Sequence, residues 1–152
     1  MKSNNANRAI LWAGLIAGTM DILAAFVTNA QRNVTPMRVL RGVASGLLGA
    51  SAAKGGTGTA ILGLFLHFVI AFGAAAVYYA ASRKLPVLIR QPIICGALFG
   101  IAVYCFMNLI VLPLSAFPYN ISRQTSVVVT GLVVHILCVG LPIALAIRKF
   151  SK

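Results

Sequence analysis

The stretch TAILGLFLHFVIAFGAAAVYYAA, residues 59–81, contains 23 residues and no formally charged side chain. A bilayer core is about 30 Å thick, and a helix that rises about 1.5 Å per residue crosses it with about 20 apolar residues. The stretch therefore predicts a membrane-spanning helix. Its one titratable side chain, His67, lies near the middle of the helix, and an ionisable group at that depth is a candidate functional residue.

The composition of the whole chain places it in the membrane class. Of 152 residues, 60% are hydrophobic and 9% are charged, whereas soluble domains carry about 25% charged residues. Lys and Arg number 13 against a single acid, Asp21, which gives a net charge of +12. The cations form short clusters between apolar runs, a pattern typical of loops that face anionic lipid headgroups. We therefore expect membrane lipids as partners and no nucleic acid.

Three further apolar segments resemble the first, at residues 9–29, 93–114 and 126–147. Thr35 and Pro36 form a helix N-cap signal, and the apolar side chains of residues 36–53 fall on one side, which indicates an amphipathic helix lying on the membrane. The sequence thus predicts an all-α integral membrane protein: one domain, residues 1–152, with four transmembrane helices and an interfacial amphipathic helix between helices 1 and 2.

The distribution of cations predicts the orientation. The first apolar run is too long for the core of a secretory signal and is expected to stay as an uncleaved helix. Four spans divide the cations into two sets, Lys2, Arg8, Arg83, Lys84, Arg90, Arg148, Lys149 and Lys152 on one side and Arg32, Arg38, Arg41, Lys54 and Arg123 on the other. The larger set is expected to face the cytoplasm, together with both termini.

Each predicted span carries one strongly polar residue. At about 1.5 Å per residue, Asp21, His67, Asn108 and His135 all lie roughly 9–13 Å below the outer end of their helices. Asp21, His67 and His135 share helix faces with small residues, so we expect these side chains to point into the bundle. Asp21 or His135 is the expected neighbour of His67.

Several roles are open for this intramembrane polar layer. Buried His and Asp side chains can simply make the hydrogen bonds that fix which helix faces meet. His67 and His135 could ligate haem b from two sides, and Asp21, His67 and His135 could bind a divalent metal such as zinc with help from Asn108. Asp with two His is also the usual equipment of a proton relay or a proton-coupled transporter.

The small residues favour a different, non-enzymatic role. Gly14 with Gly18 and Gly96 with Gly100 form GxxxG pairs, which allow two helix backbones to approach closely. They suggest an accessory or assembly subunit of a membrane complex or of a homo-oligomer. No nucleophile–base pairing and no pair of acids is present, so we do not expect an enzyme. The three cysteines, Cys95, Cys105 and Cys138, lie in apolar runs and are expected to act as small hydrophobic residues.

Several motifs resemble the YagU-like family of uncharacterised bacterial inner-membrane proteins. They are the segment from Gly14 to Gly18, His67 with the apolar run ending at Leu85-Pro86, Cys95-Gly96-Ala97 leading to Leu112-Pro113-Leu114 and Pro118, and His135 before the terminal cations. The resemblance implies a bacterial inner membrane and a loose association with acid tolerance. The chain departs from the family pattern at three places. The family has a longer insert at residues 37–53 and a histidine at the position of Asn108. Asp21 has no counterpart among these motifs. It implies no substrate, cofactor or catalytic residue.

Overall fold

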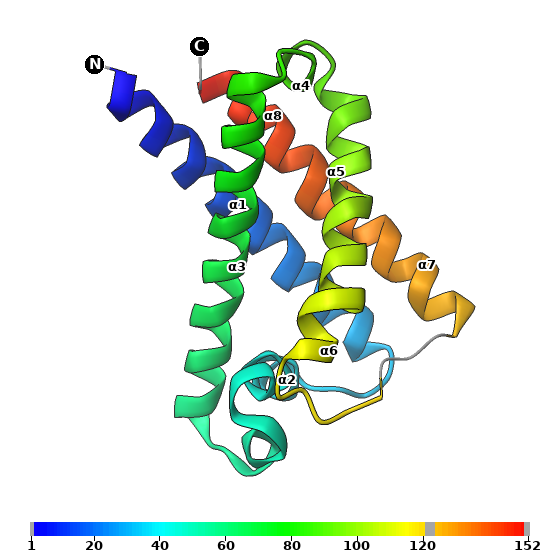
Figure 1. Ribbon diagram of the computed structural model, residues 1–152. Helices are drawn as coiled ribbons and strands as arrows, with labels where there is room; N and C mark the ends of the chain where they lie inside the picture. The colour runs from blue at the N-terminus through cyan, green and yellow to red at the C-terminus, as the bar shows by residue number, and fades with distance from the viewer. Residues whose placement is uncertain (1, 121–123, 151–152) are drawn as a thin grey trace.

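The computed structural model describes residues 2–120 and 124–150, and every regular element in those ranges is a helix. Four helical stretches are long and apolar enough to cross a membrane: Asn5–Ala30, Thr57–Lys84, Pro92–Leu114 and Thr125–Phe150. The prediction of an all-helical protein with four spans is therefore confirmed. Both ends of the chain lie at the same end of the bundle, called here the terminus end (Figure 1).

The first and second spans are single α-helices, α1 (Lys2–Ala30) and α3 (Thr57–Lys84). The third and fourth spans are interrupted. The third consists of α5 (Pro92–Phe106), the π-helical segment η2 (Met107–Val111) and α6 (Leu112–Leu114). The fourth consists of α7 (Thr125–Val134), the π-helical segment η3 (His135–Gly140) and α8 (Leu141–Phe150).

A proline explains each interruption. The segment η2 ends two residues before Pro113, and η3 ends two residues before Pro142. Proline has no N–H, and its ring clashes with the carbonyl four residues earlier. In a membrane, where every backbone group needs a partner within the protein, widening the turn to a π-helix is one way to accommodate this clash. Asn108 and His135 both lie in these widened turns.

The segment between the first two spans is helical, with one correction. Thr35 caps α2 (Pro36–Leu48), its hydroxyl accepting a hydrogen bond from Arg38 N at 3.4 Å. The predicted helix over residues 36–53 is wrong in its second part, because the backbone turns at Gly49, whose φ is 63°. The 3₁₀ helix η1 (Gly49–Lys54) follows. A second short helix, α4 (Val87–Arg90), occupies the predicted loop between the second and third spans.

Helix α2 crosses the start of α3 at the end of the bundle opposite the termini, called here the α2 end (Figure 1). The contact is close at Gly63 of α3, where an added Cβ would meet the backbone carbonyl of Leu40. No side chain other than the hydrogen of glycine fits there. Gly63 therefore sets how closely α2 can lie against the bundle.

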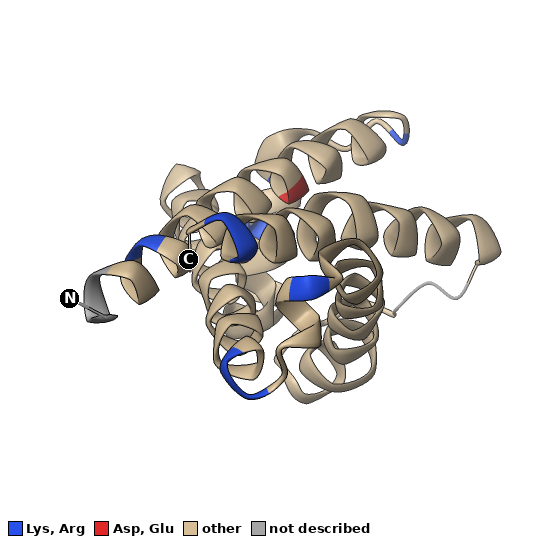
Figure 2. Cartoon of the chain, turned by 90° about the horizontal axis from the view of Figure 1, so that it is seen from above, with Lys and Arg blue, Asp and Glu red and all other residues tan. Residues whose placement is uncertain are grey.

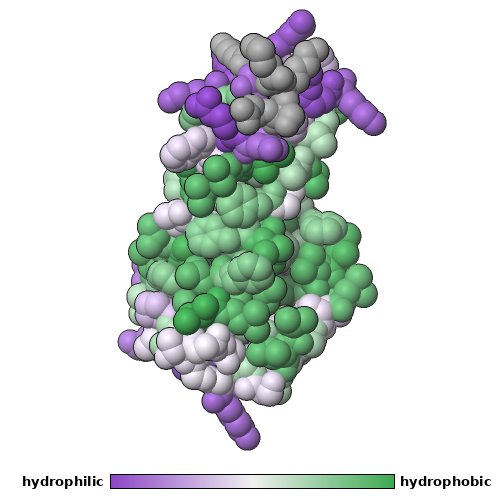
Figure 3. All heavy atoms as spheres, turned by 90° about the vertical axis from the view of Figure 1, so that its left-hand side faces the viewer, coloured by the Kyte–Doolittle hydropathy of each residue, from purple (hydrophilic) through white to green (hydrophobic). Residues whose placement is uncertain are grey.

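The tight core of the bundle lies toward the terminus end. Tyr78, Ile143 and Ile147 are fully buried there, and the Tyr78 hydroxyl donates to Leu88 O at 3.0 Å, which ties α3 to α4. By contrast, large apolar side chains are exposed in a band around the molecule, between two more hydrophilic ends (Figure 3). A surface of this kind matches the hydrocarbon of a bilayer.

Charged residues lie mainly near the ends of the spanning helices. Figure 2 marks the described Lys and Arg residues in blue and the one acid in red, seen from above. The described cations at the terminus end are Lys2, Arg8, Arg83, Lys84, Arg90, Arg148 and Lys149, and those at the α2 end are Arg32, Arg38, Arg41 and Lys54. Arg123 and Lys152, which enter the predicted orientation, lie outside the described residues. The single acid, Asp21, stands apart from all of them within α1.

Candidate functional site

The crossing of α1 and α3 brings Asp21 and His67 together. Gly18 of α1 lies so close to α3 that an added Cβ would stand 2.7 Å from the Phe68 ring. This approach lets the His67 side chain reach across the contact, where Nε2 lies 2.8 Å from the carbonyl oxygen of Gly18. The other ring nitrogen, Nδ1, lies 4.0 Å from Oδ2 of Asp21.

These two contacts determine where the protons of His67 are. A backbone carbonyl can only accept, so Nε2 must carry a hydrogen and donate it to Gly18 O. In neutral imidazole the remaining nitrogen, Nδ1, then has a lone pair that faces the Asp21 carboxyl group. A lone pair and a bare carboxylate repel each other. A hydrogen on either Nδ1 or the carboxyl group would replace this repulsion with an attraction.

The pair opens onto a cavity of about 250 Å³ between the four spans. Asp21, His67, Asn108 and His135 all contribute to its lining, so the structure brings the four polar residues of the layer to one place. The described lining contains no Lys or Arg. Cys138 lies within electrostatic reach of Asp21. At about 30 Å³ per water molecule, the cavity has room for several waters beside these side chains.

Asn108 and His135 are held by their own helices. Asn108 Nδ2 donates to Tyr104 O at 2.9 Å, and His135 Nδ1 donates to Gly131 O at 2.9 Å. Each bond runs to the backbone carbonyl four residues earlier. The two side chains belong to the first turn of a π-helical segment, and the carbonyls belong to the α-helix before it. Since Nδ1 of His135 donates, its Nε2 is the ring nitrogen with a lone pair. The Tyr104 ring packs edge-on against His135 with ring centroids 5.3 Å apart, which orients the imidazole.

The candidate metal ligands are brought together only in part. Within residues 2–120 and 124–150, no three His, Cys, Asp or Glu side chains come close enough together to hold a metal ion. Asp21 and His67 are neighbours, but His135 does not join them in such a group. To ligate a haem, His67 would have to give up the contact of Nε2 with Gly18 O or that of Nδ1 with Asp21.

Sequence reasoning missed the apolar wall of this cavity. Five residues line both it and a larger cavity at the α2 end: Val39, Val43, Ile70, Met107 and Leu112. Val39 and Val43 belong to the apolar side of α2, which the sequence placed against the membrane. The signal that could have located them is Gly63, because a glycine there permits α2 to pack on α3.

No family model, no curated protein and no solved structure matches the chain. The resemblance to the YagU-like family therefore stays a prediction from motifs. The geometry of the cavity is the basis on which a function can be argued.

Proposed function

We propose that this protein carries protons across the membrane, with the Asp21–His67 pair as its proton-binding site. The observation that supports the proposal is the position of the His67 ring between an obligate acceptor, Gly18 O, and the only acidic side chain of the chain. Intramembrane Asp and His side chains are the usual components of proton relays. The pair can hold one exchangeable proton while remaining neutral overall.

Loss of that proton leaves a buried negative charge, and the described cavity lining offers no Lys or Arg to compensate it. Burying an unpaired charge is costly, so the pair gives up its proton readily only when an acceptor and water are at hand. His135 supplies an acceptor, because it lines the same cavity and its neutral ring, with Nδ1 donating to Gly131 O, keeps a lone pair on Nε2. Asn108 offers a carbonyl oxygen that can orient water between them.

The cavity also has unequal access to the two sides of the membrane. Toward the α2 end, only the five apolar residues of the shared wall separate it from a larger cavity of about 950 Å³. Toward the terminus end lie the packed residues Ala13, Tyr78 and Ile143. Apolar constrictions of the first kind open and close by wetting. We infer that protons enter from the α2 end and that exit to the other side requires a rearrangement of the core.

The proposal includes a location. The larger described set of cations lies at the terminus end, which favours a cytoplasmic position for both termini. The motif resemblance adds the expectation of a bacterial inner membrane. Protons would then approach His67 from the outer face, through the α2 end.

The role of an accessory or assembly subunit stays a prediction. Its original support was the two glycine pairs, but an added Cβ at Gly14 or Gly18 would meet Phe72 or Phe68. Likewise, an added Cβ at Gly96 would meet Ala144 and the carbonyl of Gly140, and one at Gly100 would meet the carbonyl of His135. These glycines serve contacts inside the bundle, so they do not argue for a partner.

Proton movement can be tested in vesicles. The purified protein would be reconstituted into liposomes that contain a pH-sensitive dye, and a potassium diffusion potential would drive proton uptake. We expect wild-type vesicles to acidify faster than protein-free vesicles. Asp21→Asn and His67→Gln should each reduce the excess rate at least tenfold, because each variant removes one of the two groups between which the exchangeable proton is shared.

The matched control is Thr19→Val, which also removes a polar group from α1 but on its exposed face. This variant should retain the wild-type rate. Equal rates in wild-type and protein-free vesicles would overturn the proposal, as would a full rate in Asp21→Asn. A loss of rate in Thr19→Val equal to that in Asp21→Asn would also count against it.

A further inference from the structure

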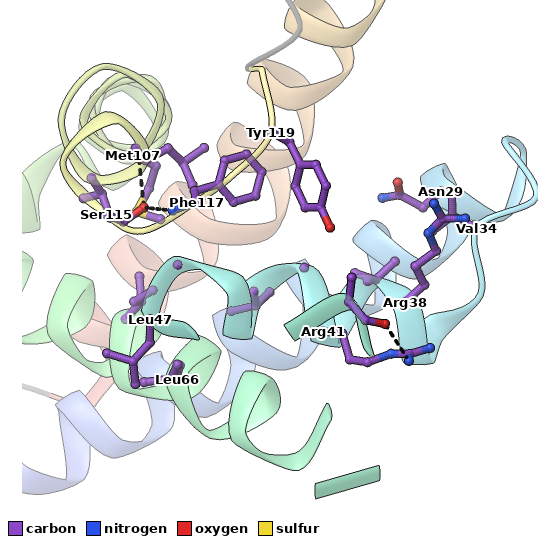
Figure 4. A pocket seen from close by; sticks show the side chains of 18 of the residues that line it. Asn29, Val34, Arg38, Arg41, Leu47, Leu66, Met107, Ser115, Phe117 and Tyr119 are labelled. Atoms are coloured by element: carbon purple, nitrogen blue, oxygen red, sulfur yellow. Dashed lines mark hydrogen bonds between the residues drawn. The ribbon is translucent and has the colours of Figure 1, made fainter. Parts of the chain in front are cut away.

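The larger cavity, at the α2 end, has a polar and an apolar part. It has a volume of about 950 Å³ and lies between α2, α3, η2 and the segment that follows α6. Arg38, Arg41, Asn29 and Tyr119 lie toward one side of it, whereas Leu47, Leu66 and Met107 lie toward the other (Figure 4). Its volume is within the range of about 300–1,000 Å³ that is typical of ligand sites.

The basic side of this cavity has unused hydrogen-bonding capacity. Arg41 Nη1 donates to Ala53 O at 3.2 Å and to Gly55 O at 2.7 Å, which holds the guanidinium in place. Its Nε is buried without a hydrogen-bond partner. Arg38 lies one turn earlier on α2 and is exposed. The single acid of the chain, Asp21, does not line this cavity, so the two positive charges have no carboxylate beside them.

We propose that this cavity binds an anionic phospholipid from the surrounding leaflet. The phosphate would lie between Arg38 and Arg41, because a guanidinium pairs with phosphate oxygens through paired N–H donors. One acyl chain would lie along Leu47, Leu66 and Met107. This inference concerns a separate cavity and does not depend on the proton-binding role of Asp21 and His67.

Both parts of the cavity are needed to select this ligand. A soluble phosphate would use the arginines and leave the apolar part unfilled, whereas an uncharged lipid would leave the two arginines unpaired. The location agrees with the chemistry, because α2 crosses the end of the bundle where the spanning helices emerge from the apolar band. Headgroups of the adjacent leaflet are expected at that level.

A substitution at a glycine can test whether an acyl chain lies in the apolar part of the cavity. Gly42 of α2 lines the cavity, and an added Cβ there would meet nothing within 4 Å. Gly42→Leu therefore fills the cavity while it leaves both arginines in place. Gly73 of α3 also has open space, but it is exposed and is not among the residues that line the cavity. Gly73→Leu is thus the matched control.

The experiment titrates the delipidated full-length protein with lipids and counts bound molecules by native mass spectrometry. The probes are phosphatidylglycerol, phosphatidylcholine with the same acyl chains, oleate, and glycerol phosphate as a soluble headgroup. We expect phosphatidylglycerol to bind wild type at least tenfold more tightly than each of the other three. Gly42→Leu and Arg38→Gln should each weaken that binding at least tenfold, and Gly73→Leu and Arg83→Gln should leave it within twofold.

Several outcomes would overturn the proposal. Equal binding of phosphatidylglycerol and phosphatidylcholine would show that the site does not select a lipid with a net negative charge, and wild-type binding by Gly42→Leu would show that the cavity is not where the lipid sits. An equal loss in Arg83→Gln and Arg38→Gln would indicate general attraction to a basic protein. Oleate or glycerol phosphate binding as tightly as phosphatidylglycerol would assign the site to a fatty acid or to a soluble anion instead.

Discussion

The imidazole of His67 has a contact at each of its two ring nitrogens, and the two contacts require different properties of the side chain. The contact with Gly18 O, at 2.8 Å, needs only an N–H donor. The contact with Asp21, at 4.0 Å, matters only if the side chain can gain or lose a proton. A substitution that keeps the first property and removes the second can therefore separate the structural role of this residue from the proposed one.

Glutamine is such a substitution, because its amide can donate to Gly18 O but does not titrate. We expect the free energy of unfolding of His67→Gln to lie within about 1 kcal/mol of the wild-type value, since the variant retains the donor. His67→Ala should cost about 2 kcal/mol or more, because it removes both a hydrogen bond worth about 0.5–1.5 kcal/mol and buried ring contacts. Thermal unfolding in mild detergent measures both. Equal destabilisation by the two variants would show that the Gly18 contact contributes little.

The polar residues of the layer could be identified from the sequence, and so could the fact that they face inward, because each is the only strongly polar side chain in a long apolar segment. What the sequence could not supply was their pairing. The partner of His67 depends on how closely α1 approaches α3, and that distance follows from how Gly14 and Gly18 meet two phenylalanine rings. The sequence could not say either which of the candidate metal ligands lie together, because periodicity places a residue on a face but does not give the distance across a bundle.

At the scale of elements, glycine decides where two helices touch and where a helix is free. Gly63 allows α2 to lie on α3, and Gly73, on the same helix, has open space around it. The same substitution should thus have opposite effects at the two positions. We expect Gly63→Ala to destabilise the protein by about 1–3 kcal/mol through overpacking against Leu40.

Gly73→Ala should instead be neutral or stabilise by about 0.5–1 kcal/mol, because alanine lowers the entropy cost of forming the helix. The measurement is again the thermal unfolding of the two variants beside wild type in the same detergent. Stabilisation by Gly63→Ala would contradict the close packing of α2 on α3.

The two π-helical segments give the second prediction at this scale. If Pro142 maintains η3, then Pro142→Ala lets the fourth span return to a regular α-helix, which rotates His135 relative to the rest of the cavity. Stability should not fall, since proline in a helix interior is itself unfavourable. The rate of proton uptake in vesicles should fall at least threefold. A variant with unchanged proton uptake would show that the π-helical turn has no part in the proposed function.

Sequence reasoning located the elements well and their interruptions poorly. Long apolar runs predicted all four spans, and the Thr35-Pro36 signal predicted the start of α2. The end of α2 at Gly49 was missed, because glycines occur throughout this chain and only one of them has a positive φ. Pro113 and Pro142 can be read from the sequence, but whether a proline yields a kink or a π-helical turn depends on the neighbouring helices.

At the scale of the whole molecule, the two halves of the bundle differ. The terminus end is closely packed around Tyr78 and Ile143, while the larger cavity lies at the α2 end and the smaller one between the spans. Because the larger set of described cations lies at the terminus end, we expect the α2 end to face the outside. Single cysteines at Ser51 or Gln91, in a background without Cys95, Cys105 and Cys138, would be treated with a membrane-impermeant maleimide in cells with a permeable outer envelope.

Ser51 lies in η1 at the α2 end and Gln91 follows α4 at the terminus end, and both are exposed. We expect Ser51→Cys to be labelled in intact cells and Gln91→Cys only after the membrane is broken. The reverse pattern would invert the orientation and with it the proposed direction of proton entry.

The central claim is that His67 and Asp21 share a proton, and it can be observed directly because the chain has only two histidines and one acid. Protein labelled with ¹⁵N-histidine would give two imidazole spin systems, assigned by comparison with His67→Gln. The account predicts that His67 carries a hydrogen on Nε2 and that Asp21→Asn shifts the Nδ1 signal of His67 far more than either nitrogen of His135. A His67 with its hydrogen on Nδ1 and a bare Nε2, or one whose signals do not respond to Asp21→Asn, would contradict it.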